Sequence, residues 1–316
     1  MVTFEPDYLY MALSEHVSPA LAYDGLLLDY TKRSLTRDSD ILNAFAGLQS
    51  QLEDRFGDGP FLGGIPAAAL NFYIIFSGHF VVLKRRAGFP SWSWAGWIGA
   101  VRLEIRGKLH DSEYVKNWLA AAAWIRWFKS SASTRPKLEP VSSSNVNRKA
   151  FDNKYCPGLD AAFTTPTLEG QLSAPDSPSV TTLHFWTVAA QFMISRIDAA
   201  PVGRECGERG IIVDSDGSVI GSVHIDDHFI EPQTIAQPFD FIVLSQANET
   251  QGGSVLVDER PYVGPGSEAW DLYWVMLVKW DDTGTVAERR GIGQIYQTSL
   301  ASGCEPGPVW KEVILA

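Results

Sequence analysis

Cysteine is scarce in this sequence of 316 residues. The three cysteines, Cys156, Cys206 and Cys304, are far apart and form no C-x-x-C pair. This pattern argues against a disulfide framework and against a zinc knuckle. A chain of this length buries roughly three quarters of its unfolded surface, so it needs neither for stability. We therefore expect a protein of a reducing compartment, the cytoplasm.

Long apolar runs are also missing. The segment nearest to a membrane span, "AALNFYIIF" at 68–76, has about half of the roughly 18 apolar residues that a membrane helix needs. The first residues, "MVTFEPDYLYMALSEH", carry acidic side chains where a secretory signal would carry basic ones. The sequence therefore predicts neither export nor insertion into a membrane.

Positive charge is in deficit, with 26 Lys and Arg against 37 Asp and Glu and a formal net charge of -11. Such a surface repels phosphate backbones and anionic membranes, so we expect no nucleic-acid partner. The 45% hydrophobic and 20% charged residues are typical of a globular protein.

Helical periodicity dominates residues 8–56. In 39–56 the apolar residues recur at steps of three and four, which places them on one helix face. These residues are Ile41, Leu42, Phe45, Leu48 and Leu52. Ser39 or Asp40 can cap this helix by accepting backbone N–H bonds. Residues 67–76 fit either a helix or a buried strand.

The pattern changes after Phe89 to the alternation of strands. Trp92 and Trp94, and then Val101, Leu103 and Ile105, lie two residues apart, as on one face of a strand. Residues 113–128 predict a helix with Trp118, Ala122 and Ile125 on one face. A polar run at 129–178 predicts a long loop.

From residue 181 onward the chain reads as successive strands. Glycine-containing turns at Asp216–Gly217 and 281–284 predict hairpins, and hairpins without intervening helices predict an antiparallel sheet. The sequence therefore predicts an α+β fold, with N-terminal helices in 1–85 packed on a mainly antiparallel β barrel or sandwich in 86–316. We expect these two regions to form one compact unit.

Six segments carry a resemblance to a known family. In order they are "YTKRSLTRDSDILNAFAGL", "FLGGIP", "KRRAGFPSWSWAGWIG", "YWVMLVKW", "AERRGIGQIY" and "WKEVILA". Together they resemble fungal heterokaryon-incompatibility (HET) proteins, in the region that follows the HET domain. The resemblance covers the first hundred residues and the last fifty. From this resemblance we expect the HET domain itself to be missing, which implies the scaffold of an incompatibility protein without its effector.

The tryptophan box, Trp92, Trp94 and Trp97, has two interpretations. The indoles either line an aromatic cavity or pack in the core, with the Arg85 or Arg86 guanidinium stacked on one of them. As substrate-binding candidates we group the box with further aromatic residues. The full set is Trp92, Trp94, Trp97, Tyr73, Phe185, Trp186 and Trp274.

Three polar residues are catalytic candidates. His79 and His184 lie in apolar surroundings, where a histidine is either a proton donor or a satisfied core residue. Asp226 is the third candidate. With His224 and His228 it alternates along one predicted strand, which is enough to begin a metal site, but polar residues also alternate at the end of any hairpin. We predict no metal.

The sequence shows no complete motif for calcium binding, nucleophilic catalysis or dinucleotide binding. "DSDG" at 214–217 lacks the remaining ligands of a calcium loop and fits a turn. There is no G-x-S-x-G elbow, and Cys206 has no histidine or helix placed to activate it. Gly291 and Gly293 lack the third glycine of a dinucleotide site and fit a bent strand. We therefore predict that the protein uses no cofactor.

Two hypotheses remain. The first is a cofactor-independent cyclase, for example an intramolecular Diels–Alderase, that folds an apolar terpenoid or polyketide intermediate of fungal secondary metabolism into its reactive shape. The second is a non-catalytic recognition module of a truncated HET-type self/non-self protein, with a protein partner. A hollow apolar cavity favours the first, and a solid interior with an exposed apolar patch favours the second.

Overall fold

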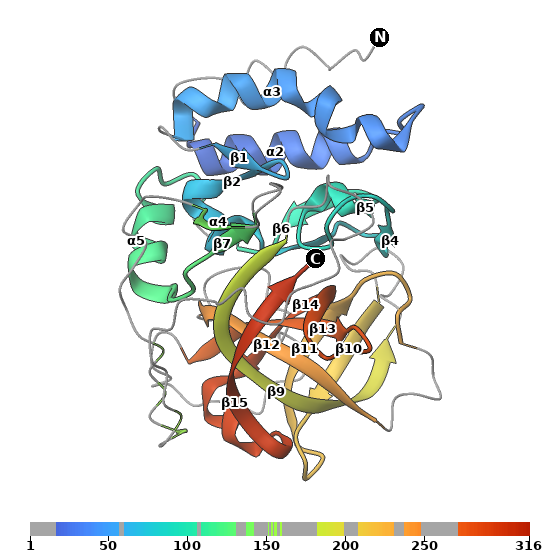
Figure 1. The fold of residues 1–316 in the computed structure, drawn as a ribbon, viewed down its shortest axis with the longest axis vertical. Coiled ribbons are helices and arrows are strands. Elements are labelled where there is room, and N and C mark those ends of the chain that lie inside the picture. The colour runs from blue at the N-terminus through green and yellow to red at the C-terminus, as the bar shows by residue number, and fades with distance from the viewer. Residues whose placement is uncertain are drawn as a thin grey trace.

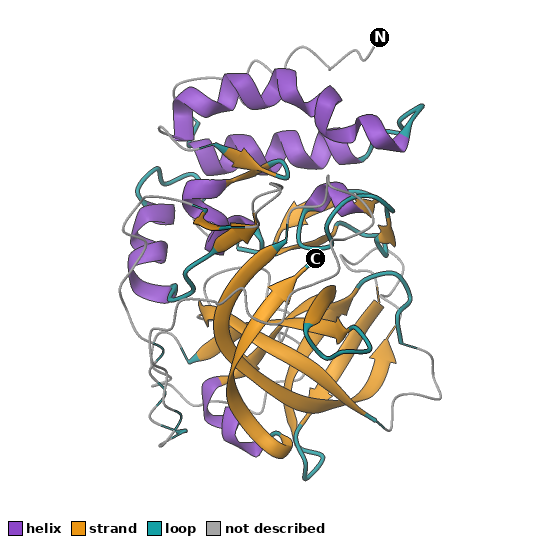
Figure 2. Cartoon of the chain, in the orientation of Figure 1, coloured by secondary structure: helices purple, strands orange, loops and turns teal. Residues whose placement is uncertain are grey.

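The fold has a helical tier above a curled β sheet (Figure 1). The computed structural model describes residues 17–56, 60–105, 109–130, 137–141, 151, 153, 155–156, 159, 182–198, 208–230, 237–247 and 271–316. Helices cluster at the N-terminal end and long strands fill the rest, so the predicted α+β class is confirmed (Figure 2). Among the described residues, no helix has both the length and the apolar character to cross a membrane.

The helical tier is built from α2 (Pro19–Thr31) and α3 (Ile41–Phe56). Pro19 opens α2, and the Ser18 hydroxyl accepts the Leu21 N–H at 3.2 Å. The predicted stripe of α3 is confirmed, because Ile41, Phe45, Leu48 and Leu52 are buried, while Leu42 is partly buried. Ser39 and Asp40 do not form a separate cap; they lie in a 3-10 turn, η1 (Asp38–Asp40), that runs directly into the helix.

A middle layer of short elements follows. Its elements are β1 (Phe61–Leu62), β2 (Ile65–Pro66), η2 (Ala67–Ala69), α4 (Leu70–Tyr73), β3 (Phe76–Gly78), β4 (Lys84–Arg85), η3 (Trp94–Gly96), β5 (Trp97–Ile98), β6 (Val101–Leu103) and α5 (Tyr114–Ala122). The pairs β1–β2, β3–β6 and β4–β5 are antiparallel. Residues 67–76, which fit both helix and strand, begin as helix and end at the start of β3.

Two local predictions in this layer are wrong. Trp92 and Trp94 do not share a strand: Trp92 lies in a turn and Trp94 opens η3, where the Ser93 hydroxyl accepts the Ala95 N–H at 3.0 Å. Ser93 therefore stabilises a 3-10 turn in place of an extended chain. The helix predicted for 113–128 ends at Ala122, so Ile125 lies beyond it in extended chain.

The sheet closes into a ring. Its strands are β7 (Phe128–Ser130), β8 (Leu138–Pro140), β9 (Leu183–Asp198), β10 (Glu208–Val213), β11 (Val219–Ile225), β12 (Pro238–Ala247), β13 (Leu272–Trp280), β14 (Val286–Tyr296) and β15 (Cys304–Leu315). Antiparallel pairing runs β9–β10–β11–β14–β13–β12 and returns to β9. The predicted barrel-like antiparallel sheet is therefore present, and η5 (Gln297–Ser302) connects β14 to β15.

Strand β9 is the hub of this ring. It pairs with β10 and β12 near its C-terminal half and with β7 and β15 near its N-terminal half. β15 also makes a short parallel pairing with β14. Both predicted turns are confirmed by left-handed glycines, Gly217 at φ 84° and Gly284 at φ 69°.

The glycines of β14 are explained by close strand packing. A Cβ at Gly291 would lie 2.4 Å from the His224 carbonyl oxygen of β11, and one at Gly293 would lie 2.4 Å from the Ser222 oxygen. No side chain fits at either position without shifting the backbone. This agrees with the interpretation of these glycines as part of a bent strand.

Candidate functional site

The tryptophan box lies in a filled core. Trp92, Trp94 and Trp97 are fully buried. The Trp94 Nε1–H donates to the Gly64 oxygen at 3.2 Å, and the Trp97 Nε1–H donates to the Ser91 oxygen at 2.7 Å. The Trp94 ring lies so close to Gly64 that a Cβ there would be 2.4 Å from it. This geometry is that of core packing, with both indole N–H groups satisfied inside the protein.

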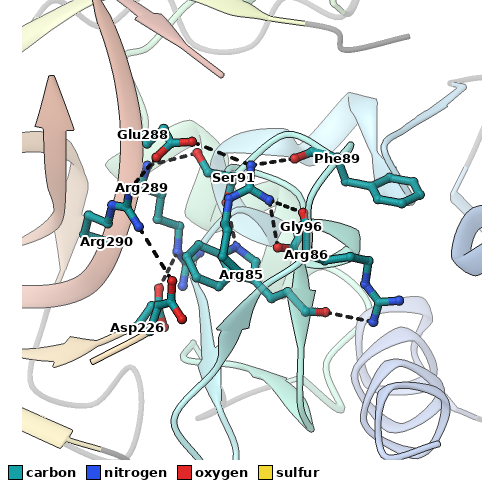
Figure 3. A network of polar contacts seen from close by, with 11 residues as sticks. Arg85, Arg86, Phe89, Ser91, Gly96, Asp226, Glu288, Arg289 and Arg290 are labelled. Carbon is teal, nitrogen blue, oxygen red and sulfur yellow. Dashed lines mark hydrogen bonds and ion pairs between the residues drawn. The ribbon is translucent and has the colours of Figure 1, made fainter. Parts of the chain in front are cut away.

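Arg85 also stabilises the tryptophan box. The core-packing interpretation predicted that Arg85 or Arg86 stacks on one of the indoles. The Arg85 guanidinium lies over the Trp97 ring at 5.6 Å from its centroid. It donates to the Gly96 oxygen at 2.9 Å and to the Phe89 oxygen at 2.6 Å, which ties the segment before the box to the 3-10 turn within it (Figure 3). Arg85 therefore stabilises the loop.

Asp226 joins the middle layer to the ring through Arg289 (Figure 3). Both side chains are fully buried, and Arg289 Nε donates to an Asp226 carboxylate oxygen at 3.0 Å. The remaining guanidinium nitrogens donate to the main-chain oxygens of Ile74 and Phe76, and the guanidinium stacks on the Phe76 ring at 3.7 Å. Burial raises the pKa of Asp226, and Arg289 opposes that rise. The carboxylate of Asp226 therefore serves as the buried counter-ion of Arg289, which is a structural role.

The three side chains expected on one strand face do not converge. His224 belongs to β11 and Asp226 points to Arg289, whereas His228 lies in a left-handed turn at φ 45° and contacts Glu208 Oε1 through Nδ1 at 2.6 Å. Within the part of the chain that the structure describes, no three His, Cys, Asp or Glu side chains could hold a metal ion.

The other candidates divide between two regions. Tyr73 is fully buried in the middle layer, 4.9 Å from the Tyr23 ring, and burial raises its pKa. His79 follows β3, and its ring is 4.0 Å from that of Phe80. On the ring, Phe185 packs on Trp127 at 4.3 Å, and Trp274 lies fully buried on β13 opposite Ser245. Cys206 lies outside the described residues.

A second group of aromatic side chains surrounds the β9–β15 pair. We define the aromatic cluster as Trp124, Phe151, Trp186, Tyr273 and Trp310. Trp186 and Trp310 stack with centroids 6.4 Å apart and planes 23° apart. Phe151 lies 6.4 Å from Trp310, 5.7 Å from Tyr273 and 5.2 Å from Trp124. Contacts therefore run without a break from the stacked pair to Trp124.

Exposure is graded along the aromatic cluster. Trp124, Phe151 and Tyr273 are buried, whereas Trp186 and Trp310 are only partly buried. The stacked pair therefore forms the solvent-facing end of the cluster.

The polar atoms of the aromatic cluster differ from those of the tryptophan box. In the part of the chain that the structure describes, the Nε1–H groups of Trp124, Trp186 and Trp310 are shielded from solvent and have no hydrogen-bond partner. A buried donor without a partner costs about 1–3 kcal/mol. Native structures leave few such groups without a reason. Among the described residues the Nε1–H groups of Trp118, Trp127 and Trp274 are unpaired as well, so the candidate binding site is marked by three such donors gathered in one connected cluster that has a partly exposed end.

His184 lies on the same strand face as the stacked pair. Its register partner on β15 is Ile314, while Trp186 faces Glu312 and Val188 faces Trp310. His184 is fully buried; its Nε2 is 2.9 Å from the Thr182 hydroxyl, and its Nδ1 has no partner among the residues whose structure is described. Burial lowers the pKa of His184 to about 4, so the imidazole is neutral at neutral pH.

This pKa predicts a loss of stability in acid. As the pH falls below 6.5, the unfolded chain protonates this histidine, while the folded protein does so only near pH 4. The free energy of unfolding should therefore fall by about 2–3 kcal/mol across that interval from this group alone. Urea titrations at several pH values measure it. His184→Gln should remove this part of the pH dependence, and an unchanged slope would contradict the assignment.

The sequence identified only part of the aromatic cluster. Trp186 and His184 were candidates, but Trp124, Phe151, Tyr273 and Trp310 were not. Trp310 opens the quoted segment "WKEVILA", so the aromatic residue was visible but its pairing with β9 was not. Phe151 lies in the polar run 129–178 and gave no signal.

Comparisons with protein-family models, with curated proteins and with solved structures found no match to this chain.

Proposed function

We propose that the protein binds an apolar small molecule at the aromatic cluster and cyclises it without a cofactor. The observation that carries the proposal is the set of buried indole N–H groups of Trp124, Trp186 and Trp310 that have no partner among the described residues.

The aromatic cluster has the character of a small-molecule site. Ligand sites are mostly apolar and aromatic, with a few polar groups that fix orientation. Here five rings supply the apolar surface, and three N–H groups supply the orientation. The partly exposed Trp186–Trp310 pair gives solvent access to the cluster.

The chemistry available at the aromatic cluster suits a unimolecular reaction. None of its five side chains is charged at neutral pH, and His184 beside them is neutral. In an intramolecular Diels–Alder closure, three π bonds of the substrate become two σ bonds and one π bond, and no proton or electron enters or leaves. The protein then has to hold the chain folded and polarise a carbonyl on the reacting alkene.

The free energy gained by fixing the rotors of the substrate is large enough to explain catalysis. Freezing a rotor costs roughly 0.5–1.5 kcal/mol, and each 1.36 kcal/mol removed from a barrier is about tenfold in rate. A substrate with four rotors fixed by the rings would gain roughly 30-fold to 25,000-fold. Indole N–H bonds to a developing negative oxygen would add to this.

The test uses the fact that cyclisation conserves mass. The full-length protein is incubated with a metabolite extract from the source organism carrying a deletion of this gene, and mass spectrometry follows compounds that change retention time without changing mass. We expect at least one such conversion. Trp186→Ala should slow it about 10–100-fold, because one stacked ring of the site is lost.

Phe80→Ala is the matched control, since Phe80 is 49% exposed and lies outside the aromatic cluster. It should leave the rate unchanged. If the wild-type protein produces no conversion at constant mass, the cyclase proposal fails. The recognition module predicted as the second hypothesis would then explain the protein better.

A further inference from the structure

From the unpartnered groups of the aromatic cluster we infer the class of its ligand: a neutral, ring-containing compound that presents carbonyl oxygens to the indole N–H groups of Trp186 and Trp310. This inference rests on the proposed function, because it assumes that the cluster is the binding site.

The unpartnered indole groups of the aromatic cluster need a ligand with hydrogen-bond acceptors. An indole N–H donates and never accepts. The unpartnered atoms at Trp124, Trp186 and Trp310 are therefore all donors. Only a ligand with acceptor atoms can satisfy them, and a carbonyl oxygen, with two lone pairs, can accept from two neighbouring indoles.

The rings and donors of the aromatic cluster also restrict the charge of its ligand. Aromatic faces attract cations, so a cationic ligand is the main competitor. An ammonium group, however, carries only donors, and a quaternary ammonium carries no acceptor, so either would leave the indole N–H groups unpaired. An anion would meet the negative faces of the rings, and Glu312 is the register partner of Trp186. A neutral acceptor avoids both costs.

Tryptophans outside the aromatic cluster differ in whether their indole N–H groups are hydrogen-bonded. In the tryptophan box, Trp94 and Trp97 donate to main-chain oxygens. Trp118 is fully buried on α5, and its N–H also has no partner in the described chain. Its ring contacts Phe72 at 5.3 Å, and within the same residues it makes no ring contact with the cluster. Trp118 therefore provides a control in which an equally unpaired N–H is removed outside the aromatic cluster.

The experiment uses three bicyclic probes of similar size: coumarin with a carbonyl, naphthalene with no acceptor, and N-methylquinolinium with a positive charge. Binding to the full-length protein is measured by ligand-observed NMR titration. We expect coumarin to bind about tenfold or more tightly than naphthalene, as one good hydrogen bond is worth about that factor. N-methylquinolinium should bind no better than naphthalene.

Substitutions that keep an aromatic ring, although a smaller one, and remove the N–H locate the effect. Trp186→Phe and Trp310→Phe should each bring coumarin closer to naphthalene in affinity, while Trp118→Phe should leave the preference unchanged. Equal affinities for coumarin and naphthalene, or a preference for N-methylquinolinium, would overturn the inference about ligand class and leave the site in place. If Trp186→Ala does not weaken the binding of any probe, the site itself is wrong and the proposed function falls with it.

Discussion

Asp226→Ala should lower the free energy of unfolding by about 3–5 kcal/mol, the usual cost of leaving one partner of a buried ion pair alone. The reason is the complete burial of Arg289, whose charge no water can reach. The main-chain oxygens of Ile74 and Phe76 would still accept its N–H groups, but they supply no negative charge. Urea denaturation followed by circular dichroism measures the loss.

Two further variants separate charge from shape. Asp226→Asn keeps an acceptor oxygen near Arg289 Nε and should lose less than the alanine variant. The double variant Asp226→Leu with Arg289→Met removes both charges and should recover most of the stability, because apolar replacements of buried ion pairs are often neutral or stabilising. A loss below about 1 kcal/mol for Asp226→Ala would show that water reaches the pair.

Trp94→Ala should cost about 4 kcal/mol or more, at the upper end of the range for large core residues. The Trp94 ring packs edge-on against Tyr30 at 5.9 Å and Phe45 at 5.0 Å, and its N–H bonds to Gly64, so helices α2 and α3 both lose their main contact with the box. Since domains are stable by only about 5–15 kcal/mol, this variant should be close to unfolding at 37 °C.

Comparing Trp94→Ala with Trp186→Ala distinguishes a tryptophan of the core from a tryptophan of the candidate site. Trp186 is partly exposed, so its replacement should cost less stability than that of Trp94 while reducing conversion of the substrate. Urea titration and the constant-mass conversion assay are run on both variants. The opposite result, a stable Trp94→Ala protein without activity, would return the candidate site to the tryptophan box.

The sequence predicted the second half of the fold better than the first. The segments of β9 to β15 run for six or more residues and contain Val, Ile or aromatic residues, and Gly217 and Gly284 mark turns, so local signals agreed with the final structure. The W-x-W spacing of Trp92 and Trp94 has the period of a strand, but Pro90 and Ser93 favour turns, and these local preferences determined the outcome.

The candidate site was less predictable than the fold. His184 and Trp186 are two residues apart on one strand, so their common face follows from the sequence. Trp310 and Tyr273 come from strands whose register with the rest of the sheet depends on pairing between distant segments. Trp124 reaches the aromatic cluster only because α5 ends early, at Ala122, which the helical periodicity of 113–128 did not show.

The pairing of β9 with β15 has a kinetic consequence. Leu183 opposes Leu315, and β9 contacts four strands drawn from both sides of it in the chain. Such distant partners must find each other by diffusion of a largely open chain, which makes assembly of the ring slow. During that wait the edges of β9 are bare and able to pair with another molecule, so heterologous production should yield more native protein at low synthesis rates.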